Sequence, residues 1–291
     1  MSHMKPKHWR EAFLYLISIV VALIMLMPFI WSLVTSLRPD EEIIKLPIQW
    51  IPSRITFEHY KQAFELVPFA LYFKNSFYLA AMGTLFNLVF ASLSGYALAK
   101  LYFPARDLIF KILLSAMMIP SVVTLIPTFF VLKHMPFLGG NDILGAGGDG
   151  LLNTFWAIIL PGASGSFAVF MMRQFFFALP NDLQEVSRIE GAGEFRIFWN
   201  IYVPLTKPAL ATLGIFTFQA GWNSFLGPLI YLNDPKMKTI QQGLAAFSYN
   251  KHVDFGPLMA GALVSILPIL ILFLLLQRYF VQGIAFTGTK G

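Results

Sequence analysis

The sequence contains no cysteine, and only 12% of its 291 residues are charged. The absence of cysteine excludes disulfide bonds and thiolate metal sites. A soluble domain usually has about 25% charged residues. The low charge, together with 57% hydrophobic residues, therefore indicates an integral membrane protein.

The sequence also lacks the patterns of a nucleotide or metal site. No Gly-Lys dipeptide occurs, so the chain has no Walker A phosphate loop, and the histidines show no ligand spacing such as His-Glu-x-x-His. We therefore expect no catalytic residue, no metal site and no cofactor in this chain, and we do not expect it to be an enzyme.

Six stretches contain no Asp, Glu, Lys, Arg or His, and each is long enough to cross a bilayer, which takes roughly 20 residues of helix. A single buried core would not give six separate stretches of this length. We predict an all-α membrane protein with six transmembrane helices. The six stretches are 12–37, 75–99, 112–132, 150–172, 208–233 and 255–277.

The net charge of +6 could suggest a nucleic-acid partner, but its distribution indicates membrane topology instead. If the N-terminus is cytoplasmic and six spans alternate, Lys and Arg divide 12 inside to 9 outside, while Asp and Glu divide 6 to 9. Lys and Arg orient membrane spans, most clearly in short loops near their ends. The sequence therefore predicts cytoplasmic termini and contact with membrane lipid, and it predicts no nucleic-acid partner.

A charged, helix-forming stretch, 179–208, separates the fourth and fifth apolar stretches. Asp182 followed by Glu185 is the pattern of a capping box, which predicts a helix that starts near Leu183. This connection is far longer than the roughly two to eight residues that usually join two helices. We therefore expect it to have a role beyond joining two spans.

Glycine and proline divide this stretch. Gly191 and Gly193 interrupt the first helix, and Pro204 is expected to end a second helix over 194–202. Apolar side chains are expected on one side of the first helix, at Leu183, Val186 and Ile189. A short helix with a mixed apolar and charged face can lie in a groove of a partner protein.

The spacing within 179–208 resembles the EAA coupling motif of bacterial ATP-binding-cassette (ABC) importer permeases. That motif reads Glu-Ala-Ala, three residues, Gly, nine residues, Ile-x-Leu-Pro. Arg188 to Ala192 stands where permeases for sugars and oligosaccharides have A-R-I-D-G-A. The sequence thus resembles the family of inner-membrane permease subunits of carbohydrate (maltose-type) ABC importers. The residues that carry the motif here are Glu185, Val186, Ser187, Gly191, Ile201 and Pro204.

The resemblance implies a type I ABC importer permease with a cytoplasmic coupling-helix loop at 179–208. A cytoplasmic N-terminus, 1–11, would precede a permease domain over 12–291, with a core at about 70–282. The loop would dock on a separate ATPase dimer that carries ATP and Mg. Further partners would be a second permease subunit, in a heterodimer, and an extracytoplasmic solute-binding protein. The protein would lie in the bacterial cytoplasmic (inner) membrane and pass a sugar or oligosaccharide by alternating access.

The fifth stretch resembles the family pattern F-x-x-x-W-N-E/D-F-x-x-P-L-I, with Ser224 in place of the acidic residue. Gln219 and Asn223 are four residues apart, so a helix presents both amides on one face. Amides can bind sugar hydroxyls and an aromatic ring can stack on a sugar, but the same side chains can also join helices. The fourth stretch adds candidates near its Pro161-Gly162 break. The candidates for the solute pathway are Gln219, Trp222, Asn223, Phe225, Ser164 and Phe167.

Two alternatives stay open. One is an ABC permease for a non-sugar solute, although a charged solute would favour a charged cavity over amides and aromatics. The other is an ion-coupled secondary transporter. Such proteins usually place ionisable groups inside the membrane, and the six stretches contain none.

Glycine is concentrated in an outer loop, 134–149, with the sequence HMPFLGGNDILGAGGD. The loop lacks the Gly-Lys-Ser/Thr of a phosphate-binding loop. Its glycine content leads us to expect a mobile connection.

Overall fold

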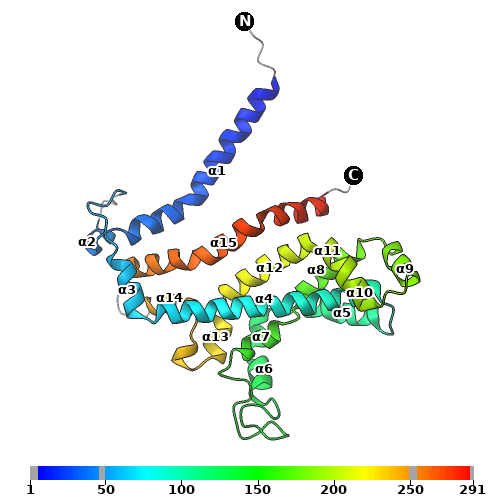
Figure 1. The fold of residues 1–291 in the computed structure, drawn as a ribbon. Coiled ribbons are helices and arrows are strands. Elements are labelled where there is room, and N and C mark those ends of the chain that lie inside the picture. Colours follow the sequence, from blue (N-terminus) through cyan, green and yellow to red (C-terminus); the bar gives the residue numbers. More distant parts are fainter. Residues whose placement is uncertain (1–5, 46–49, 249–253, 289–291) are drawn as a thin grey trace. The chain divides into compact units, whose positions relative to one another are not determined.

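The computed structural model describes residues 6–45, 50–248 and 254–288, and every regular element in these ranges is helical (Figure 1). The chain divides into two compact parts. The first comprises Met1–Phe69 with Leu244–Leu267, and the second comprises Ala70–Gly243 with Pro268–Gly291.

Among the described residues, four single helices are long and apolar enough to cross a membrane, and counting each of two bent helix pairs as one span gives up to six spans. Five of the six overlap the predicted stretches closely, whereas the fifth begins at Glu194 in the charged loop and ends at Trp222, so it overlaps only part of 208–233. The two bent pairs have angles of 109° and 79°. The four single spans are Arg10–Ser36, Phe69–Lys100, Trp156–Phe177 and Phe255–Arg278. The bent spans are Arg106–Ala116 with Ser121–Lys133, and Glu194–Leu205 with Lys207–Trp222.

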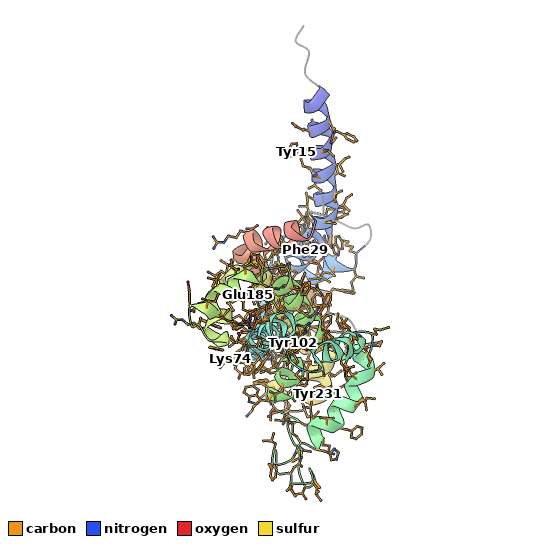
Figure 2. All side chains as sticks on the ribbon, turned by 90° about the vertical axis from the view of Figure 1, so that its right-hand side faces the viewer. Tyr15, Phe29, Lys74, Tyr102, Glu185 and Tyr231 are labelled. Carbon is orange, nitrogen blue, oxygen red and sulfur yellow. The ribbon has the colours of Figure 1, made fainter. Side chains whose placement is uncertain are left out.

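The first part contains α1 (Pro6–Ser36), α2 (Asp40–Ile43), α3 (Glu58–Leu66) and the first turns of α15 (Phe255–Gly288). The side chains of α1 are exposed from residue 10 to residue 30 and stand clear of the helix on several sides (Figure 2). A helix that is apolar all round suits a lipid environment.

His59 joins the elements of the first part. Its ring is 1% exposed, and its Nε2 donates a hydrogen bond to the carbonyl oxygen of Arg38 at 2.7 Å. Gly256 lies against the same ring, so closely that a Cβ would be 2.3 Å from it. The start of α15 therefore packs on α3 because residue 256 has no side chain.

The second part is built along α4 (Phe69–Lys100). Its C-terminal half packs against α8 (Ser166–Phe177), and the two backbones meet at Gly95. A Cβ on Gly95 would lie 2.7 Å from Cβ of Met172 and 2.9 Å from the backbone nitrogen of Arg173. Small residues allow this kind of close helix approach in membranes.

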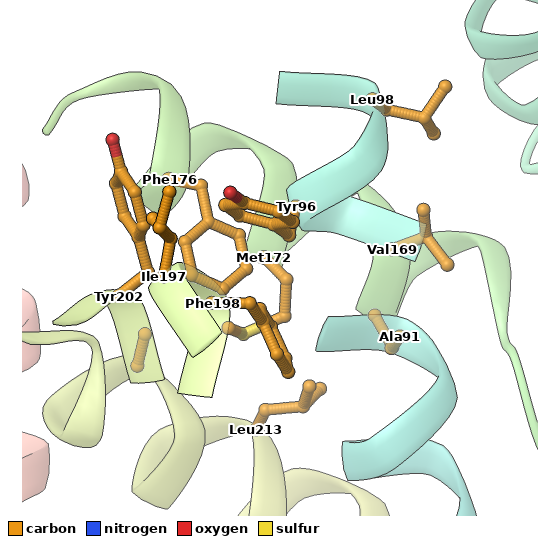
Figure 3. Packing of buried hydrophobic residues seen from close by; sticks show 12 residues of the cluster. Ala91, Tyr96, Leu98, Val169, Met172, Phe176, Ile197, Phe198, Tyr202 and Leu213 are labelled. Atoms are coloured by element: carbon orange, nitrogen blue, oxygen red, sulfur yellow. The ribbon is translucent and has the colours of Figure 1, made fainter. Parts of the chain in front are cut away.

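A cluster of buried apolar side chains surrounds this contact and joins α4 and α8 to α12 (Lys207–Trp222) and to the helical loop before α12 (Figure 3). Aromatic rings dominate its centre. The buried members are Ala91, Tyr96, Leu98, Ala168, Val169, Met172, Phe176, Ile197, Phe198, Tyr202, Ala209 and Leu213.

The fourth span is broken where the sequence predicts. Helix α7 (Trp156–Gly162) contains Pro161, and α8 begins at Ser166. Backbone carbonyls freed by such a break need another donor inside a membrane. The side-chain amide of Asn87 on α4 donates to the carbonyl oxygen of Gly162 at 2.8 Å.

The glycine-rich loop over 134–149 follows α6 (Ser121–Lys133), and its own polar groups hold it together. The amide of Asn141, 8% exposed, donates to the carbonyl oxygens of Lys133 and Met135 and accepts from the backbone N–H of Gly148. A Cβ at Gly148 would lie 2.1 Å from a backbone oxygen. The glycines therefore allow close backbone crossings within the loop, and the mobility of the loop stays a prediction.

Candidate functional site

The helical loop between the fourth and fifth spans begins with α9 (Asp182–Ile189). The predicted capping box is wrong: Asn181 is the N-cap, and no side chain caps the helix. Asn181 has helical backbone angles, so Asp182 already lies in the first turn. There its carboxylate is placed to interact favourably with the helix dipole. The Oδ1 of Asn181 instead accepts from Nζ of Lys100 at 2.7 Å, which ties the start of α9 to α4.

The end of α9 is the predicted glycine turn. Gly191 has a φ of +84°, a left-handed conformation that favours glycine. Its N–H donates to the carbonyl oxygen of Arg188 at 3.0 Å, and the N–H of Ala192 donates to that of Ser187 at 2.9 Å. These two bonds form a Schellman motif, which satisfies the last carbonyls of the helix.

The second helix of the loop is longer than predicted. It runs through α10 (Glu194–Ile197), a π-helix over Phe198–Tyr202 and α11 (Val203–Leu205). The expectation that Pro204 ends it is therefore wrong. A proline ring normally clashes with the carbonyl four residues earlier, and the wider π-turn before Pro204 relieves that crowding. The chain bends by 79° only after Leu205, where α12 begins.

A hydrogen-bonded group around Glu194 fixes α9 to the rest of the second part. The Oε2 of Glu194 accepts from the hydroxyl of Tyr96 and from Nε2 of Gln184, both at 2.9 Å. Its Oε1 accepts from Nε of Arg188 at 2.6 Å. This bond raises the pKa of Arg188 above its ordinary value, so the guanidinium stays charged. Tyr96 and Gln184 are only 4% and 3% exposed, which places half of the group inside the protein.

Aromatic rings pack around Tyr96 and so stabilise the hydrogen-bonded group at Glu194. The ring of Tyr96 lies 5.8 Å from that of Phe176, 5.2 Å from that of Phe198 and 5.3 Å from that of Tyr202, between centroids. The hydroxyl of Tyr202 also donates to the carbonyl oxygen of Pro180 at 3.3 Å. The loop's own π-helix thus packs with α4 and α8 in one aromatic cluster (Figure 3).

The outward side of α9 carries apolar side chains. Leu183, Val186 and Ile189 are 37%, 55% and 86% exposed, and their spacing of three residues keeps them on one side of the helix. Glu185 is exposed as well, at the periphery of the helices (Figure 2). α9 therefore offers a short apolar surface, bordered by charge, that nothing covers in the described part of the chain.

The other motif residues lie elsewhere in the loop. Ser187 is buried, and its hydroxyl donates to the carbonyl oxygen of Leu183 at 2.6 Å. Ile201 is partly buried against the aromatic cluster, and Pro204 is exposed. The motif thus contains outward-facing, buried and turn-forming positions.

Sequence reasoning missed the residues that hold this loop in place, which are Gln184, Glu194, Tyr96 and Lys100. Glu194 had one available signal, because it follows Gly193 and opens a helix where a carboxylate is favoured. Tyr96 and Lys100 lie at the end of the second span, and nothing in the sequence pairs them with the loop. Only the close approach of α4 and α8 brings them there.

The predicted solute-path residues fall into two groups. Gln219 and Asn223 are exposed at the C-terminal end of α12, and Nε2 of Gln241 approaches Oδ1 of Asn223 at 3.4 Å. Trp222 is only 1% exposed, with its ring 5.1 Å from that of Phe73 and 6.0 Å from that of Phe218. The amides therefore face outward together, while the indole packs inside the protein.

Of the remaining predicted pathway residues, two lie at the break of the fourth span and one, Phe225, follows Asn223 by two positions. Ser164 is exposed within the break of the fourth span, and Phe167 is 51% exposed just after it. Phe225 is partly buried. Among the described residues, no group of three or more His, Cys, Asp or Glu side chains could hold a metal ion.

Comparison with known proteins identifies the family. Residues 87–286 match the family described as binding-protein-dependent transport system inner membrane component. The chain is 33% identical over 274 residues to the arabinooligosaccharides transport system permease protein AraQ of Halalkalibacterium halodurans, covering 93% of each chain. It is 29% identical over 282 residues to the sn-glycerol-3-phosphate transport system permease protein UgpE of Yersinia pestis, covering 94% of this chain and 95% of that protein.

A solved structure has the same fold. It is a chain of a bacterial ABC transporter involved in the import of the acidic polysaccharide alginate, with a TM-score of 0.78 and 22% sequence identity. The match covers 96% of this chain and 100% of that one. These findings confirm the predicted all-α, six-span permease fold. The chain belongs to the family of binding-protein-dependent transport system inner membrane components, which are multi-pass permeases.

Proposed function

We propose that this chain is the transmembrane subunit of an ATP-driven importer that passes a sugar or oligosaccharide across the cytoplasmic membrane by alternating access. The observation that carries the proposal is the uncovered apolar side of α9 at Leu183, Val186 and Ile189, on a helix that is fixed to the aromatic core. A short amphipathic helix of this kind suits a groove in another protein. The similarity to AraQ supports an oligosaccharide as the solute.

The partners follow from this role. A separate ATPase dimer would bind ATP and Mg and receive α9, with Glu185, Val186 and Gly191 among the coupling residues. A second permease subunit would complete the pathway, and an extracytoplasmic binding protein would deliver the solute. The family description, which names binding-protein-dependent transport, supports the last partner.

The solute path in this chain would use exposed amides. Gln219 and Asn223 stand one helical turn apart, and Gln241 approaches Asn223, so donors and acceptors for hydroxyl groups lie together. The similarity to UgpE keeps a phosphorylated solute as the second candidate. From Pro208 to Asn223 the chain carries no cationic side chain, which favours a neutral sugar.

Both ends of the chain would be cytoplasmic. Residues 1–5 and 289–291 lie outside the described residues, so labelling is the appropriate test. The chain has no native cysteine, and single cysteines can therefore be introduced without further changes. Cysteines at Ser2 and Thr289 should resist a membrane-impermeant reagent in whole cells, and one at Asn250 should react. Labelling of either terminus from outside would contradict the topology.

The decisive experiment reconstitutes this chain with its ATPase, second permease and binding protein in proteoliposomes. Uptake of an arabinooligosaccharide series and of sn-glycerol-3-phosphate is measured with and without ATP. Oligosaccharide uptake that needs both ATP and the binding protein supports the proposal. Uptake of glycerol phosphate alone would favour the second solute class. Uptake by this chain without any ATPase would refute the proposal.

A charge reversal tests the docking surface itself. Glu185→Lys should reverse the charge beside the apolar side of α9 and weaken association with the ATPase. Co-purification of the ATPase in detergent is the measurement, with Asp182→Lys in the same helix as the comparison. If the same amount of ATPase co-purifies with Glu185→Lys and with the parent, Glu185 does not contribute to docking.

A further inference from the structure

Glu194 is the point at which three segments of the chain meet. Its two carboxylate oxygens accept hydrogen bonds from Gln184 and Arg188 on α9 and from Tyr96 on α4, at 2.6 to 2.9 Å. Glu194 itself opens α10. One side chain therefore connects the docking helix, the second helix of the loop and the second span.

The connection through Glu194 matters because the turn between α9 and α10 makes few contacts of its own. A Cβ placed on Gly191 or on Gly193 would have no atom within 4 Å other than immediate neighbours. The turn is therefore not packed against the rest of the protein. Its orientation depends on side-chain bonds made on either side of it, and Glu194 makes three of them.

The hydrogen bonds from the buried residues Tyr96 and Gln184 contribute more to holding α9 in place than the exposed ion pair does. Arg188 and Glu194 are 48% and 40% exposed, and an ion pair between exposed groups contributes little by itself. Tyr96 and Gln184 are almost fully buried, so their donors have no water to replace a lost acceptor. Hydrogen bonds to an ionised carboxylate are also roughly twice as strong as neutral ones.

We propose that Glu194 is a positioning residue for transport: it locks α9 onto α4, so that movement imposed on α9 by a docked ATPase reaches the second span. This inference rests on the proposed function for its transport consequence, but its structural claim concerns this chain alone. Without the carboxylate, α9 would still form and dock, because its helix and its exposed apolar side chains do not depend on Glu194. The start of α9 would stay held by the bond between Lys100 and Asn181, but its C-terminal half would move more freely about the glycine turn, and ATP would be hydrolysed without matching solute movement.

The first test measures the position of α9 in the full chain in lipid nanodiscs. Spin labels on cysteines at Ile189, 86% exposed, and Tyr102, 95% exposed, report the distance between α9 and the segment directly after α4. We expect one narrow distance distribution in the parent and a broad one in Glu194→Ala. Glu194→Gln should be intermediate, because an amide oxygen can still accept from Tyr96 or Gln184.

Asp182→Ala is the matched control. It removes a carboxylate from the same loop, and Asp182 is exposed and makes no side-chain hydrogen bond recorded among the described residues. Its distance distribution should match that of the parent. An unchanged distribution in both Glu194→Ala and Tyr96→Phe would overturn the proposal. This test needs no ATPase, so its failure is separate from failure of the proposed function.

The second test measures ATP hydrolysed per solute imported in reconstituted complexes. In Glu194→Ala we expect this ratio to rise about tenfold, the scale set by losing hydrogen bonds to a charged group. Tyr96→Phe removes a single oxygen, and we expect a smaller rise in the same direction. Combining it with Glu194→Ala should add less than its separate effect, because the two changes share the Tyr96–Glu194 bond and only the 3.4 Å bond from Nε2 of Gln184 to the Tyr96 hydroxyl is lost in addition.

The ratio separates positioning from stability. A variant that only destabilises the protein lowers the number of assembled complexes and leaves the ratio per complex unchanged. A parental ratio in assembled Glu194→Ala and Tyr96→Phe complexes would overturn the inference. An absence of ATP-driven uptake in the parent complex would refute the proposed function and leave the distance measurement to decide the rest.

Discussion

Two regions along α4, both within the second part of the molecule, are packed in opposite ways. Near its C-terminal end, Gly95 brings α4 into backbone contact with α8, beside the aromatic cluster and the Glu194 group. Further back, Gly83 has no atom within 4 Å of a built Cβ, and it lines a cavity of about 240 Å³. The hydroxyl of Thr84 also lines this cavity, and it has no hydrogen-bond partner within the described part of the chain.

The difference indicates how one helix bundle can pass a displacement from helix to helix in one region and let helices move apart in another. Tight contacts have few alternative arrangements, so they carry a displacement from one element to the next. The cavity is lined mainly by small side chains on α4, α7 and α12, so these helices have room to change their separation. We expect the loop end to behave as a rigid unit and the cavity region to accommodate conformational change.

The largest effect should come from breaking the rigid end at its turn. Gly191 has a φ of +84°, whereas proline requires about −65°, and proline would also remove the N–H that bonds to Arg188. Gly191→Pro should abolish uptake in proteoliposomes while the protein still inserts into the membrane. Gly191→Ala should have a smaller effect, because strain in the left-handed region costs about 1–2 kcal/mol. Normal uptake by Gly191→Pro would show that the turn does not take part in coupling.

A pair of glycine substitutions compares the two regions directly. Gly95→Ala forces a Cβ against the backbone of α8 and should destabilise the protein by about 1–3 kcal/mol. Gly83→Ala meets open space and should be neutral or stabilising, by up to about 1 kcal/mol, because alanine favours helix. Thermal unfolding in the same detergent measures both. Equal melting temperatures for the two variants would remove the proposed contrast.

A smaller effect is expected at the exposed amides. Asn223→Ala should weaken solute affinity by about 0.5–1.5 kcal/mol, which is about 2- to 12-fold, since its side chain is exposed and loses one ordinary hydrogen bond. The affinity is read from the concentration dependence of uptake, and ATP hydrolysis stimulated by the binding protein should persist. Trp222→Ala is unsuitable for this purpose, because truncating a buried Trp costs about 3–5 kcal/mol of stability.

The smallest effect concerns the unpaired hydroxyl of the cavity. Thr84→Val replaces that hydroxyl by a methyl group of similar shape, so no hydrogen bond is lost. We expect a change in stability within about 1 kcal/mol, towards higher stability, because an unsatisfied polar atom is removed. A clear loss of uptake with unchanged melting temperature would instead assign the Thr84 hydroxyl a role in transport.

The sequence predicted the spans well, because uncharged stretches of more than 20 residues have few alternatives to a membrane helix. The turn at Gly191 was equally predictable, since glycine after a helix favours the left-handed conformation. Both features depend on local chemistry. The exposed apolar side of α9 also followed from spacing alone.

The errors concern contacts between distant segments. Asp182 and Glu185 have the spacing of a capping box, but the helix begins one residue earlier, after Asn181. The side chain of Asn181 is held by Lys100, 81 residues before it, and no local pattern indicates that contact. Trp222 shares a motif with two amides, yet its ring is buried by Phe73 on α4. Periodicity assigns a residue to a face, but the neighbouring helix decides whether that face is lined with solvent or with protein.

The π-helix over Phe198–Tyr202 affects how far the chain rotates about the helix axis within the loop. Each residue of an α-helix turns the chain by about 100°, and a π-helix contains one residue more per hydrogen-bonded ring. The wider turn therefore contains one extra residue without the rotation of about 100° that an insertion in a regular α-helix would cause. Deleting one residue within Phe198–Tyr202 should convert this segment to an α-helix and change the direction of the following side chains little. Deleting one residue within the regular helix α12 should instead rotate every later residue of that helix by about 100°. The π-helix thus marks the place in the loop where the number of residues can change while the helix faces on either side keep their directions.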